Sequence, residues 1–211
     1  MSLMEWNGIM KGRKLASERL PHILRLPLVG SGRDLLLKFL KKGSSVLDMG
    51  ANDRNVGRFL KERGVEVEYL SFDVDRSLEH DYYNLKDIDR TFDAVVLFDV
   101  IEHMSVKEAA ACLSEARRLL KKGGVLVVST PNVCHPVVFW RDCTHITAFR
   151  YDELYGLMAS AGFEDIRIYR CGSFSLRDRL VAFLLSPVLR LLRMDYAPGI
   201  VAVGMNGVLA G

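Results

Sequence analysis

Two acidic side chains flank a glycine turn in the first half of the chain. Asp48 lies in the predicted buried strand 45–49, which is followed at once by Gly50, while Asp73 ends a second predicted strand, 67–74. In an open parallel sheet, nucleotide-like ligands bind at the carboxyl ends of the strands. A carboxylate at such an end can accept hydrogen bonds from both hydroxyls of a ribose. The pattern therefore predicts a site for a ribose-containing ligand.

Two histidines near later predicted strands are candidates for a general base. His103 comes shortly after Asp99 and the predicted strand 92–98, and His145 lies in a loop that follows the predicted strand 125–129. Histidine is the side chain best suited to accept a proton near neutral pH. Both histidines are expected at the carboxyl edge of the sheet, which is also the edge of the glycine turn.

Alternating strand-like and helix-like segments position these residues. The predicted strands are 45–49, 67–74, 92–98, 125–129, 163–169 and 199–205, and the predicted helices are 34–42, 56–63, 107–121 and 151–161. This alternation is typical of an α/β fold with a doubly wound, mostly parallel sheet. Residues 1–32 are predicted to form a partly helical N-terminal arm, and residues 33–211 one domain with a helical insertion at about 175–195.

Composition excludes several classes of protein. The chain has 211 residues, of which 49% are hydrophobic and 26% charged, as in an ordinary soluble domain. Lys plus Arg exceeds Asp plus Glu by 29 − 26 = 3 without any block of like charge, so nucleic acid is not an expected partner. The four cysteines form no CxxC pair, and no apolar stretch is long enough to span a membrane, so we expect a cytoplasmic protein.

Four separated stretches, in the same order, resemble the class I S-adenosylmethionine-dependent methyltransferases. These stretches are 46–64, 92–104, 120–132 and 161–164. The branch they resemble includes ubiquinone-pathway and glycan-associated O-methyltransferases. The resemblance implies a Rossmann-like methyltransferase fold with a seven-stranded sheet and S-adenosyl-L-methionine as the cofactor.

The resemblance also implies a cofactor site. Gly50 and the backbone after it would hold the methionine part, Asp73 the ribose, and Asp99 with Val100 would lie beneath the sulfonium. Asp81 would take the place of the acid that meets the adenine amino group, an exposed loop acid being the alternative. The full implied set is Asp48, Gly50, Ala51, Asn52, Asp73, Val74, Asp81, Asp99 and Val100.

Two departures from the family pattern stand out. Asn52 and Arg54 occupy positions where the family usually has glycine. Asn tolerates a left-handed backbone, whereas Arg54 either lies beyond the tight part of the loop or reaches the cofactor carboxylate. Only 16 residues, 76–91, separate Asp75 from Phe92, so the helix that the family normally has there is predicted to be lost.

Methyl transfer to oxygen or nitrogen needs an aligned nucleophile and removal of a proton. We expect His145 to face the acceptor, because Trp140 and Phe149 in its loop could exclude water. His103 is expected to open the helix 107–121, where free N–H groups disfavour a charged imidazole, so its role would be structural. This assignment requires no metal.

An apolar stripe with flanking arginines runs from Leu176 to Leu192, between the last two predicted strands. Such a helix can pack on its own domain, form a homodimer, or lie on a membrane surface. It is too short and too charged to span a bilayer. Peripheral membrane contact and a lipid-linked substrate are therefore alternatives to an ordinary packed helix.

The expected function is S-adenosylmethionine-dependent methylation, on oxygen of a small molecule or of a glycan or lipid-linked intermediate. One alternative is a metal-assisted RNA 2′-O-methyltransferase, because Asp99, Glu102, His103 and His145 resemble the carboxylate and histidine set of the small-RNA terminal methylating enzymes. The first member of that set is Asp here and Glu there, and the low net charge argues against RNA. Another alternative is a non-catalytic scaffold that binds the cofactor.

Overall fold

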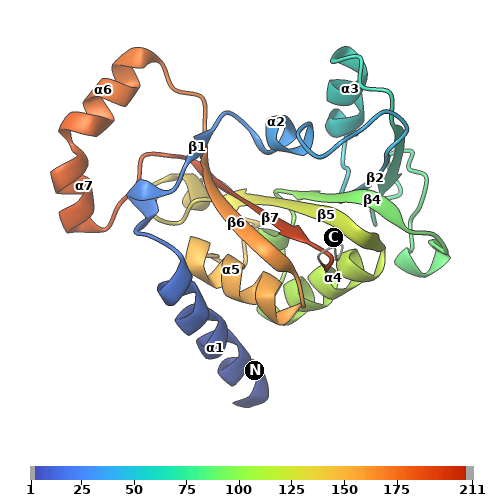
Figure 1. The fold of residues 1–211 in the computed structure, drawn as a ribbon, viewed down its shortest axis with the longest axis horizontal. Coiled ribbons are helices and arrows are strands. Elements are labelled where there is room, and N and C mark those ends of the chain that lie inside the picture. The colour runs from blue at the N-terminus through green and yellow to red at the C-terminus, as the bar shows by residue number, and fades with distance from the viewer. Residues whose placement is uncertain (1–2, 208–211) are drawn as a thin grey trace.

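The computed structural model describes residues 3–207, which form a seven-stranded sheet between two layers of helices (Figure 1). The strand order is β1-β6-β7-β5-β4-β2-β3. The strands are β1 (Leu28–Val29), β2 (Ser45–Met49), β3 (Glu68–Phe72), β4 (Phe92–Phe98), β5 (Leu120–Pro131), β6 (Glu164–Cys171) and β7 (Gly199–Met205). Only β7 runs antiparallel to its neighbours. The predicted doubly wound, mostly parallel fold is confirmed.

Each face of the sheet buries its own apolar core. The helices are α1 (Leu3–Arg19), α2 (Gly32–Leu36), α3 (Asn55–Glu62), α4 (Val106–Arg118), α5 (Tyr151–Ser160), α6 (Leu176–Leu184) and α7 (Ser186–Leu192). Residues of α1, α4 and α5 pack on one face and residues of α2 and α3 on the other. Along β4, Val95 and Leu97 join the first core while Ala94 and Val96 join the second, because side chains alternate across a strand.

The helix predicted over 34–42 is wrong in its extent. The structure has α2 over Gly32–Leu36 only, because Ser31 caps it by accepting a hydrogen bond from the Asp34 N–H at 3.1 Å. After α2 the chain turns through short backbone hydrogen bonds before entering β2. This arrangement leaves α2 above the carboxyl edge of β5 and close to the sheet.

The N-terminal arm contributes to the sheet. β1 pairs in parallel with β6 at the edge of the sheet. α1 crosses α5 so closely that a Cβ atom on Gly12 would lie 2.6 Å from the Cα of Gly156. The described part of the N-terminal arm, residues 3–32, is therefore partly helical and packed on the rest of the chain.

The segment between β3 and β4 is short and almost without regular structure. The described chain has only the 3-10 turn Leu85–Asp87 there, together with one isolated bridge between Phe72 and Tyr82. The bridge is parallel and lies directly beyond the end of β3. The predicted loss of a helix is confirmed.

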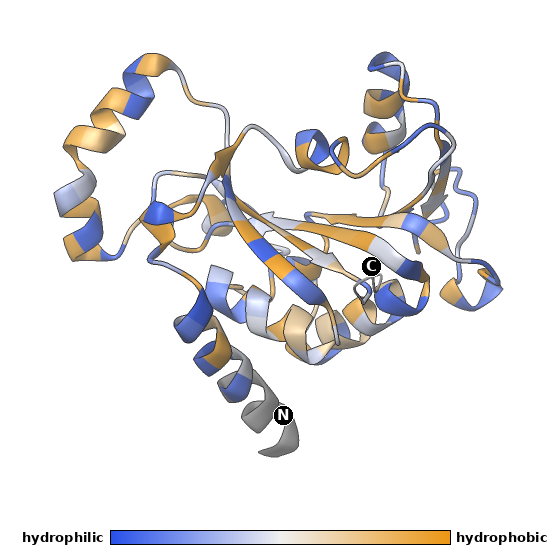
Figure 2. Cartoon of the chain, in the orientation of Figure 1, coloured by the Kyte–Doolittle hydropathy of each residue, from blue (hydrophilic) through white to orange (hydrophobic). Residues whose placement is uncertain are grey.

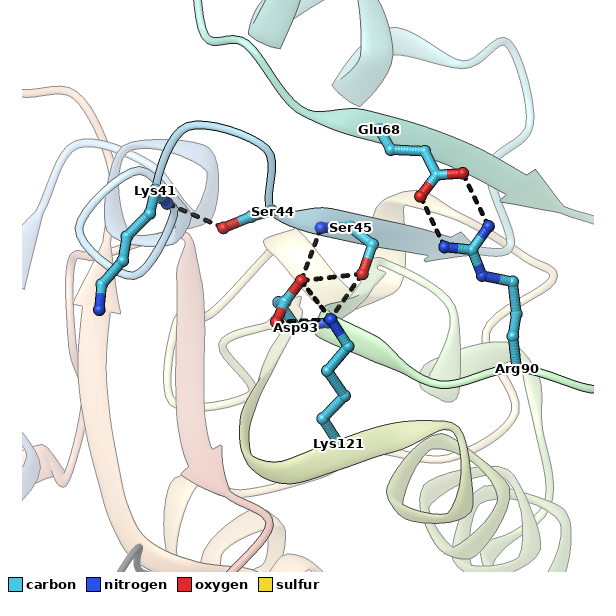
Figure 3. A network of polar contacts seen from close by, with 7 residues as sticks. All are labelled: Lys41, Ser44, Ser45, Glu68, Arg90, Asp93 and Lys121. Carbon is cyan, nitrogen blue, oxygen red and sulfur yellow. Dashed lines mark hydrogen bonds and ion pairs between the residues drawn. The ribbon is translucent and has the colours of Figure 1, made fainter. Parts of the chain in front are cut away.

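Paired charges occupy the amino edge of the sheet (Figure 3). The Asp93 carboxylate accepts hydrogen bonds from the backbone N–H and hydroxyl of Ser45 at 2.8 and 2.9 Å, and from the Lys121 ammonium at 2.9 Å. Arg90 holds Glu68 through two hydrogen bonds of 2.7 and 2.6 Å. These contacts tie together the beginnings of β2, β3, β4 and β5. Because these charged groups are already paired with one another, the functional site is expected at the opposite, carboxyl edge of the sheet.

Candidate functional site

A cavity of about 620 Å³ opens at the carboxyl ends of β2, β3 and β4. Leu85, Met104 and Cys112 give it apolar walls. Six of the nine residues implied for the cofactor line it, namely Gly50, Asn52, Asp73, Val74, Asp99 and Val100. The other three, Asp48, Ala51 and Asp81, lie outside its lining.

Gly50 makes the turn at the floor of this cavity. Its φ is +78°, and a Cβ atom there would lie 2.6 Å from Cγ2 of Val100. Glycine is therefore required twice, by the left-handed backbone and by the close approach of Val100. The N–H groups of Gly50 and Ala51 both donate to the carbonyl oxygen of Phe72, at 2.8 and 3.1 Å, which holds the turn against the end of β3.

The two non-glycine positions of the loop both have left-handed backbones. Asn52 has φ +41° and Arg54 has φ +59°. The Asn52 N–H donates to the Asp73 carboxylate at 2.9 Å, which joins the loop to the predicted ribose acid. Arg54 lies at the N-terminal cap of α3, with its guanidinium 3.1 Å from Asp81 and 5.6 Å from the centre of the Tyr69 ring. The Arg54 backbone thus belongs to the tight turn, since its N–H donates to the Ala51 carbonyl at 2.7 Å, while its side chain does not line the cofactor cavity.

Asp81 is a structural acid in this geometry. Its carboxylate accepts hydrogen bonds from the Ser71 N–H at 2.8 Å and the Ser71 hydroxyl at 2.7 Å, besides the contact with Arg54. These bonds hold the short connection between β3 and β4 against β3. All three contacts use Oδ2, and Asp81 is exposed, so it combines the exposed loop position given as the alternative with a structural role; its contact with adenine stays a prediction.

Asp48 lies beneath the cavity and is only 2% exposed. Its pKa is raised to about 6, chiefly by burial and also by the neighbouring Asp73, while the hydrogen bond from the Tyr69 hydroxyl at 2.6 Å acts in the opposite direction. The bond to Tyr69 crosses from β2 to β3. Asp48 therefore supports the site from below.

A second cluster combines Glu102, His103 and His145. Glu102 and His103 lie in the 3-10 turn Ile101–His103, and His145 comes from the loop after β5. One ligand atom from each lies within 4.8 Å of the others, and the two imidazole rings are 4.9 Å apart. The backbone carbonyl of Glu102 accepts hydrogen bonds from the N–H groups of Ile146 and Thr147, at 2.7 and 3.0 Å, which docks the loop on the turn.

Hydrogen bonds fix the orientation of both imidazole rings. Nδ1 of His145 lies 2.7 Å from the carbonyl oxygen of Phe139, so this nitrogen carries the proton. Nδ1 of His103 lies 3.0 Å from the Thr144 hydroxyl, which itself donates to Asp142 at 2.6 Å, so this nitrogen is also the donor. In both neutral rings Nε2 is left with a free lone pair. Asp142 lies 4.0 Å from Nε2 of His145 and would stabilise the protonated ring.

Glu102 is the member of the cluster that the predicted catalytic pair lacks. It is completely buried, and neither carboxylate oxygen has a hydrogen-bond partner among the described residues. Its pKa is raised to about 8, chiefly by burial and also by Asp99 and Asp142, while its own backbone and the nearby Thr130 hydroxyl act in the opposite direction. A buried carboxylate without a partner is costly unless a cation or proton compensates it. Its position next to His103 in the sequence was the available signal.

The predicted position of His103 is wrong. His103 ends a 3-10 turn, and α4 begins only at Val106, where Ser105 and Glu108 form a capping box. His103 therefore precedes the helix and is not part of its first turn. His103 lines the cofactor cavity, and the reason for separating its role from that of His145 disappears.

The apolar neighbour of His145 also differs from the prediction. Trp140 is 78% exposed, and Phe149 belongs to the main core of the domain. Phe139 instead lies with its ring 5.0 Å from the His145 ring, and the His145 side chain is 9% exposed. Phe139 thus both orients His145 through its carbonyl and shields it through its ring.

A second cavity, of about 420 Å³, lies across Asp99 from the first. Asp99 lines both, with φ +55° and a hydrogen bond of 3.0 Å from the Ser129 hydroxyl. Phe98, Pro131, Gly172 and Pro198 are among the walls of the second cavity. Asp99 is therefore placed where a ligand in one cavity meets a ligand in the other.

Comparison with known proteins agrees with this geometry. Residues 22–168 match a family model described as a methyltransferase domain. Two Mycobacterium tuberculosis proteins, from strains CDC 1551 / Oshkosh and H37Rv, are each named "probable S-adenosylmethionine-dependent methyltransferase" and are 38% identical over 92 residues. That match covers 41% of this chain and 31% of each relative, so it spans about a third of the relatives' length.

Solved structures share the fold. A SAM-dependent methyltransferase from Archaeoglobus fulgidus superposes with a TM-score of 0.63 at 18% identity, covering 82% of this chain and 94% of that one. Phosphoethanolamine N-methyltransferase 2 of Haemonchus contortus, solved with S-adenosyl-L-methionine, gives a TM-score of 0.58 at 16% identity over 84% of this chain and 52% of that one. The matched family model covers more than half of the chain. The chain therefore belongs to the class I S-adenosylmethionine-dependent methyltransferases, whose cofactor is the one predicted from the sequence.

Proposed function

We propose that the chain transfers the methyl group of S-adenosylmethionine to an oxygen atom of a small molecule, a glycan or a lipid-linked intermediate. The observation that carries this proposal is the pair of free Nε2 atoms on His103, which lines the cofactor cavity, and on His145, whose ring centre lies 4.9 Å from that of His103. A hydroxyl is a poor nucleophile until it loses its proton, so a base beside the methyl group favours an oxygen acceptor.

In the proposed methyl transfer, one bond forms for each bond that breaks. The acceptor oxygen attacks the methyl carbon, an O–C bond forms, and the C–S bond breaks to leave a neutral thioether. Nε2 of His145 takes the hydroxyl proton, while the Phe139 carbonyl holds the ring through Nδ1. The Asp142 carboxylate, 4.0 Å from Nε2, stabilises the imidazolium that forms.

The experiment is incorporation of radioactive methyl from S-adenosylmethionine into small-molecule, glycan and lipid fractions. A label that survives mild base as an ether supports the proposal, whereas release as methanol shows a methyl ester and a basic labelled product shows N-methylation. Titration calorimetry on the same protein separates a scaffold from an enzyme. Cofactor binding without transfer to any fraction would contradict the proposal.

A second candidate function is metal-assisted methyl transfer at the same cluster. It is favoured by Glu102, whose two buried oxygens have no hydrogen-bond partner among the described residues and lie beside the free nitrogens of His103 and His145. One carboxylate with two imidazoles is a ligand set that suits divalent transition metals. When bound, such a cation would lower the pKa of an acceptor hydroxyl, and the histidines would act as ligands instead of bases.

Direct binding distinguishes the two candidates. The metal candidate predicts saturable Co²⁺ absorption or Mn²⁺ resonance changes that disappear in Glu102→Gln and persist in the control His22→Ala, whose ring lies in an exposed turn. It also predicts loss of activity with a chelator and recovery with Mn²⁺ or Mg²⁺. Full activity in chelator, with no binding signal, leaves His145 as the base.

A further inference from the structure

The last two helices form a protrusion with an apolar surface. We call residues 176–193, which contain α6, α7 and the cap residue Arg193, the terminal hairpin, because the chain leaves and re-enters the same end of the sheet; the two helices follow one another along the protrusion (Figure 1). Of the fourteen large apolar side chains that are exposed among those described, nine lie here: Leu176, Leu180, Val181, Phe183, Leu184, Leu185, Val188, Leu191 and Leu192. Apolar colouring dominates both helices in Figure 2. Soluble domains rarely expose so many contiguous apolar side chains without a partner.

The terminal hairpin also carries the net charge of the chain. Residues 176–193 contain four arginines and one acid, a charge of 4 − 1 = +3, and the whole chain has a net charge of +3. The remaining residues are therefore balanced, with 25 basic and 25 acidic side chains. All four arginines, Arg177, Arg179, Arg190 and Arg193, are exposed. Positive charge and exposed apolar surface thus coincide on one element.

A rigid base holds the terminal hairpin on the domain. Asp195, completely buried just after α7, pairs with Arg170 at 2.7 Å and accepts a hydrogen bond from Asn132 at 2.8 Å. The rings of Phe174 and Tyr196 meet at 4.9 Å across the base. Within the two helices only Ala182 is buried. The exposed leucines are therefore not part of the domain's core.

We propose that the terminal hairpin docks on the surface of an anionic lipid bilayer. Apolar side chains enter the boundary between headgroups and acyl chains, and arginines at the same depth pair with lipid phosphates while their stems stay apolar. Charge complementarity favours this occupant over a second copy of the chain, which would bring two +3 surfaces together. α6 and α7 have nine and seven residues, and no helix in the described part of the chain is long and apolar enough to cross a membrane.

The attachment points connect the terminal hairpin to the active edge of the sheet. The chain leaves β6 at Cys171 and returns into β7 at Gly199, and these two residues are paired. Gly172 and Pro198, at the start and end of the excursion, line the second cavity, across Asp99 from the cofactor cavity. Docking would therefore place the mouth of that cavity beside the lipid surface. The docking itself does not rest on the proposed methyl transfer.

Vesicle sedimentation tests the docking without cofactor or acceptor. The full chain should sediment with vesicles of equal phosphatidylcholine and phosphatidylglycerol, much less with phosphatidylcholine alone, and less as salt is raised. Replacing Leu184 and Leu191 with Glu should weaken partitioning at least about tenfold. Replacing Arg190 and Arg193 with Gln should weaken it by about fivefold per arginine, a value that follows from the usual strength of a basic residue at an anionic surface.

Matched controls define the outcomes. Leu78→Glu changes an exposed leucine elsewhere, and Lys107→Gln with Lys122→Gln removes the same charge from the domain surface; neither should alter partitioning. If the Leu184 and Leu191 variant unfolds, the arginine pair decides, because it leaves the apolar surface intact. Partitioning that is equal for neutral and anionic vesicles, or unchanged in the arginine pair, overturns the proposal. A dimer in sedimentation velocity with no vesicle binding overturns it in favour of self-association.

Discussion

The cofactor cavity and the cluster of Glu102, His103 and His145, which we call the acceptor side, are built differently. On the cofactor side, backbone and carboxylates are already bonded to one another: the Gly50 turn to Phe72, Asn52 to Asp73, and Asp81 to Ser71. On the acceptor side, the reactive groups have atoms that are free to accept a proton or bind a metal. These are the buried carboxylate oxygens of Glu102 and the Nε2 atoms of His103 and His145. A rigid cradle suits binding of a fixed cofactor, whereas free lone pairs suit proton or metal chemistry.

The largest effect is expected on the acceptor side. His145→Ala removes the proposed base and should lower turnover by about 100- to 10,000-fold. S-adenosylmethionine affinity should stay within about twofold, because His145 does not line the cofactor cavity. Initial rates and titration calorimetry measure the two quantities separately, with His22→Ala as the control. A large loss of S-adenosylmethionine affinity in His145→Ala would show that His145 also contributes to cofactor binding.

The next largest effect is expected on folding stability, through Asp48, which lies beneath the cofactor cavity. Asp48 has a folded pKa of about 6, above its usual value of 3.8, so its stabilising contribution is complete below pH 3.8 and is lost as the pH rises through 6. Asp48→Asn removes this loss, and its amide oxygen can still accept from Tyr69. The free energy of unfolding at pH 7 should rise by up to about 3 kcal/mol, with little difference near pH 4. Urea unfolding at both pH values checks this; a loss of stability at pH 7 would contradict it.

Removal of the ribose acid should have a somewhat smaller effect. Asp73→Ala leaves cofactor hydroxyls unpaired and should weaken S-adenosylmethionine binding by about 1 to 3 kcal/mol, measured by titration calorimetry. Asp75→Ala is the matched control, because it removes a carboxylate that lines the same cavity but was not predicted to hold the ribose. Equal affinities for the Asp73 variant and the native chain would remove Asp73 from the site.

The smallest effect is expected in the loop itself. Asn52 has φ +41°, which Asn and Gly both adopt easily, so Asn52→Gly should change cofactor affinity by less than about threefold. Asn52→Val at the same backbone position should destabilise the fold by about 1 to 3 kcal/mol, because a β-branched side chain disfavours this conformation. Thermal unfolding and calorimetry on the pair test whether backbone shape, and not the Asn side chain, is what the cradle needs.

The cofactor side was predictable because its signals are local. The acid in β2, the glycine directly after it and the acid at the end of β3 are separated by short stretches of chain, and neighbouring parallel strands bring their ends together automatically. Asn52 was correctly expected to tolerate the turn. The sequence left open where the Arg54 side chain lies, because its partner Asp81 is 27 residues away, in a segment without regular structure.

The acceptor side was predictable only in part. His145 and His103 were both identified, but the helix boundary that separated them was wrong by a few residues, and Ser105 rather than His103 precedes α4. The burial of Glu102 depends on the loop 142–147 closing over the 3-10 turn, through hydrogen bonds between segments more than 40 residues apart. No local pattern encodes such a contact.

The sequence by itself determined the α/β fold, the cofactor and the apolar, arginine-flanked stripe, because each is encoded by periodicity or by residues close together in the chain. The tertiary structure decided which side chains are bonded into the scaffold, which are buried without a partner and which stay exposed. It bonded Asp81 into the scaffold, left Glu102 buried without a partner, and held the leucines of the terminal hairpin away from the core. The physical reason is that hydrogen bonding and burial depend on neighbours from distant segments, which only the folded chain brings together.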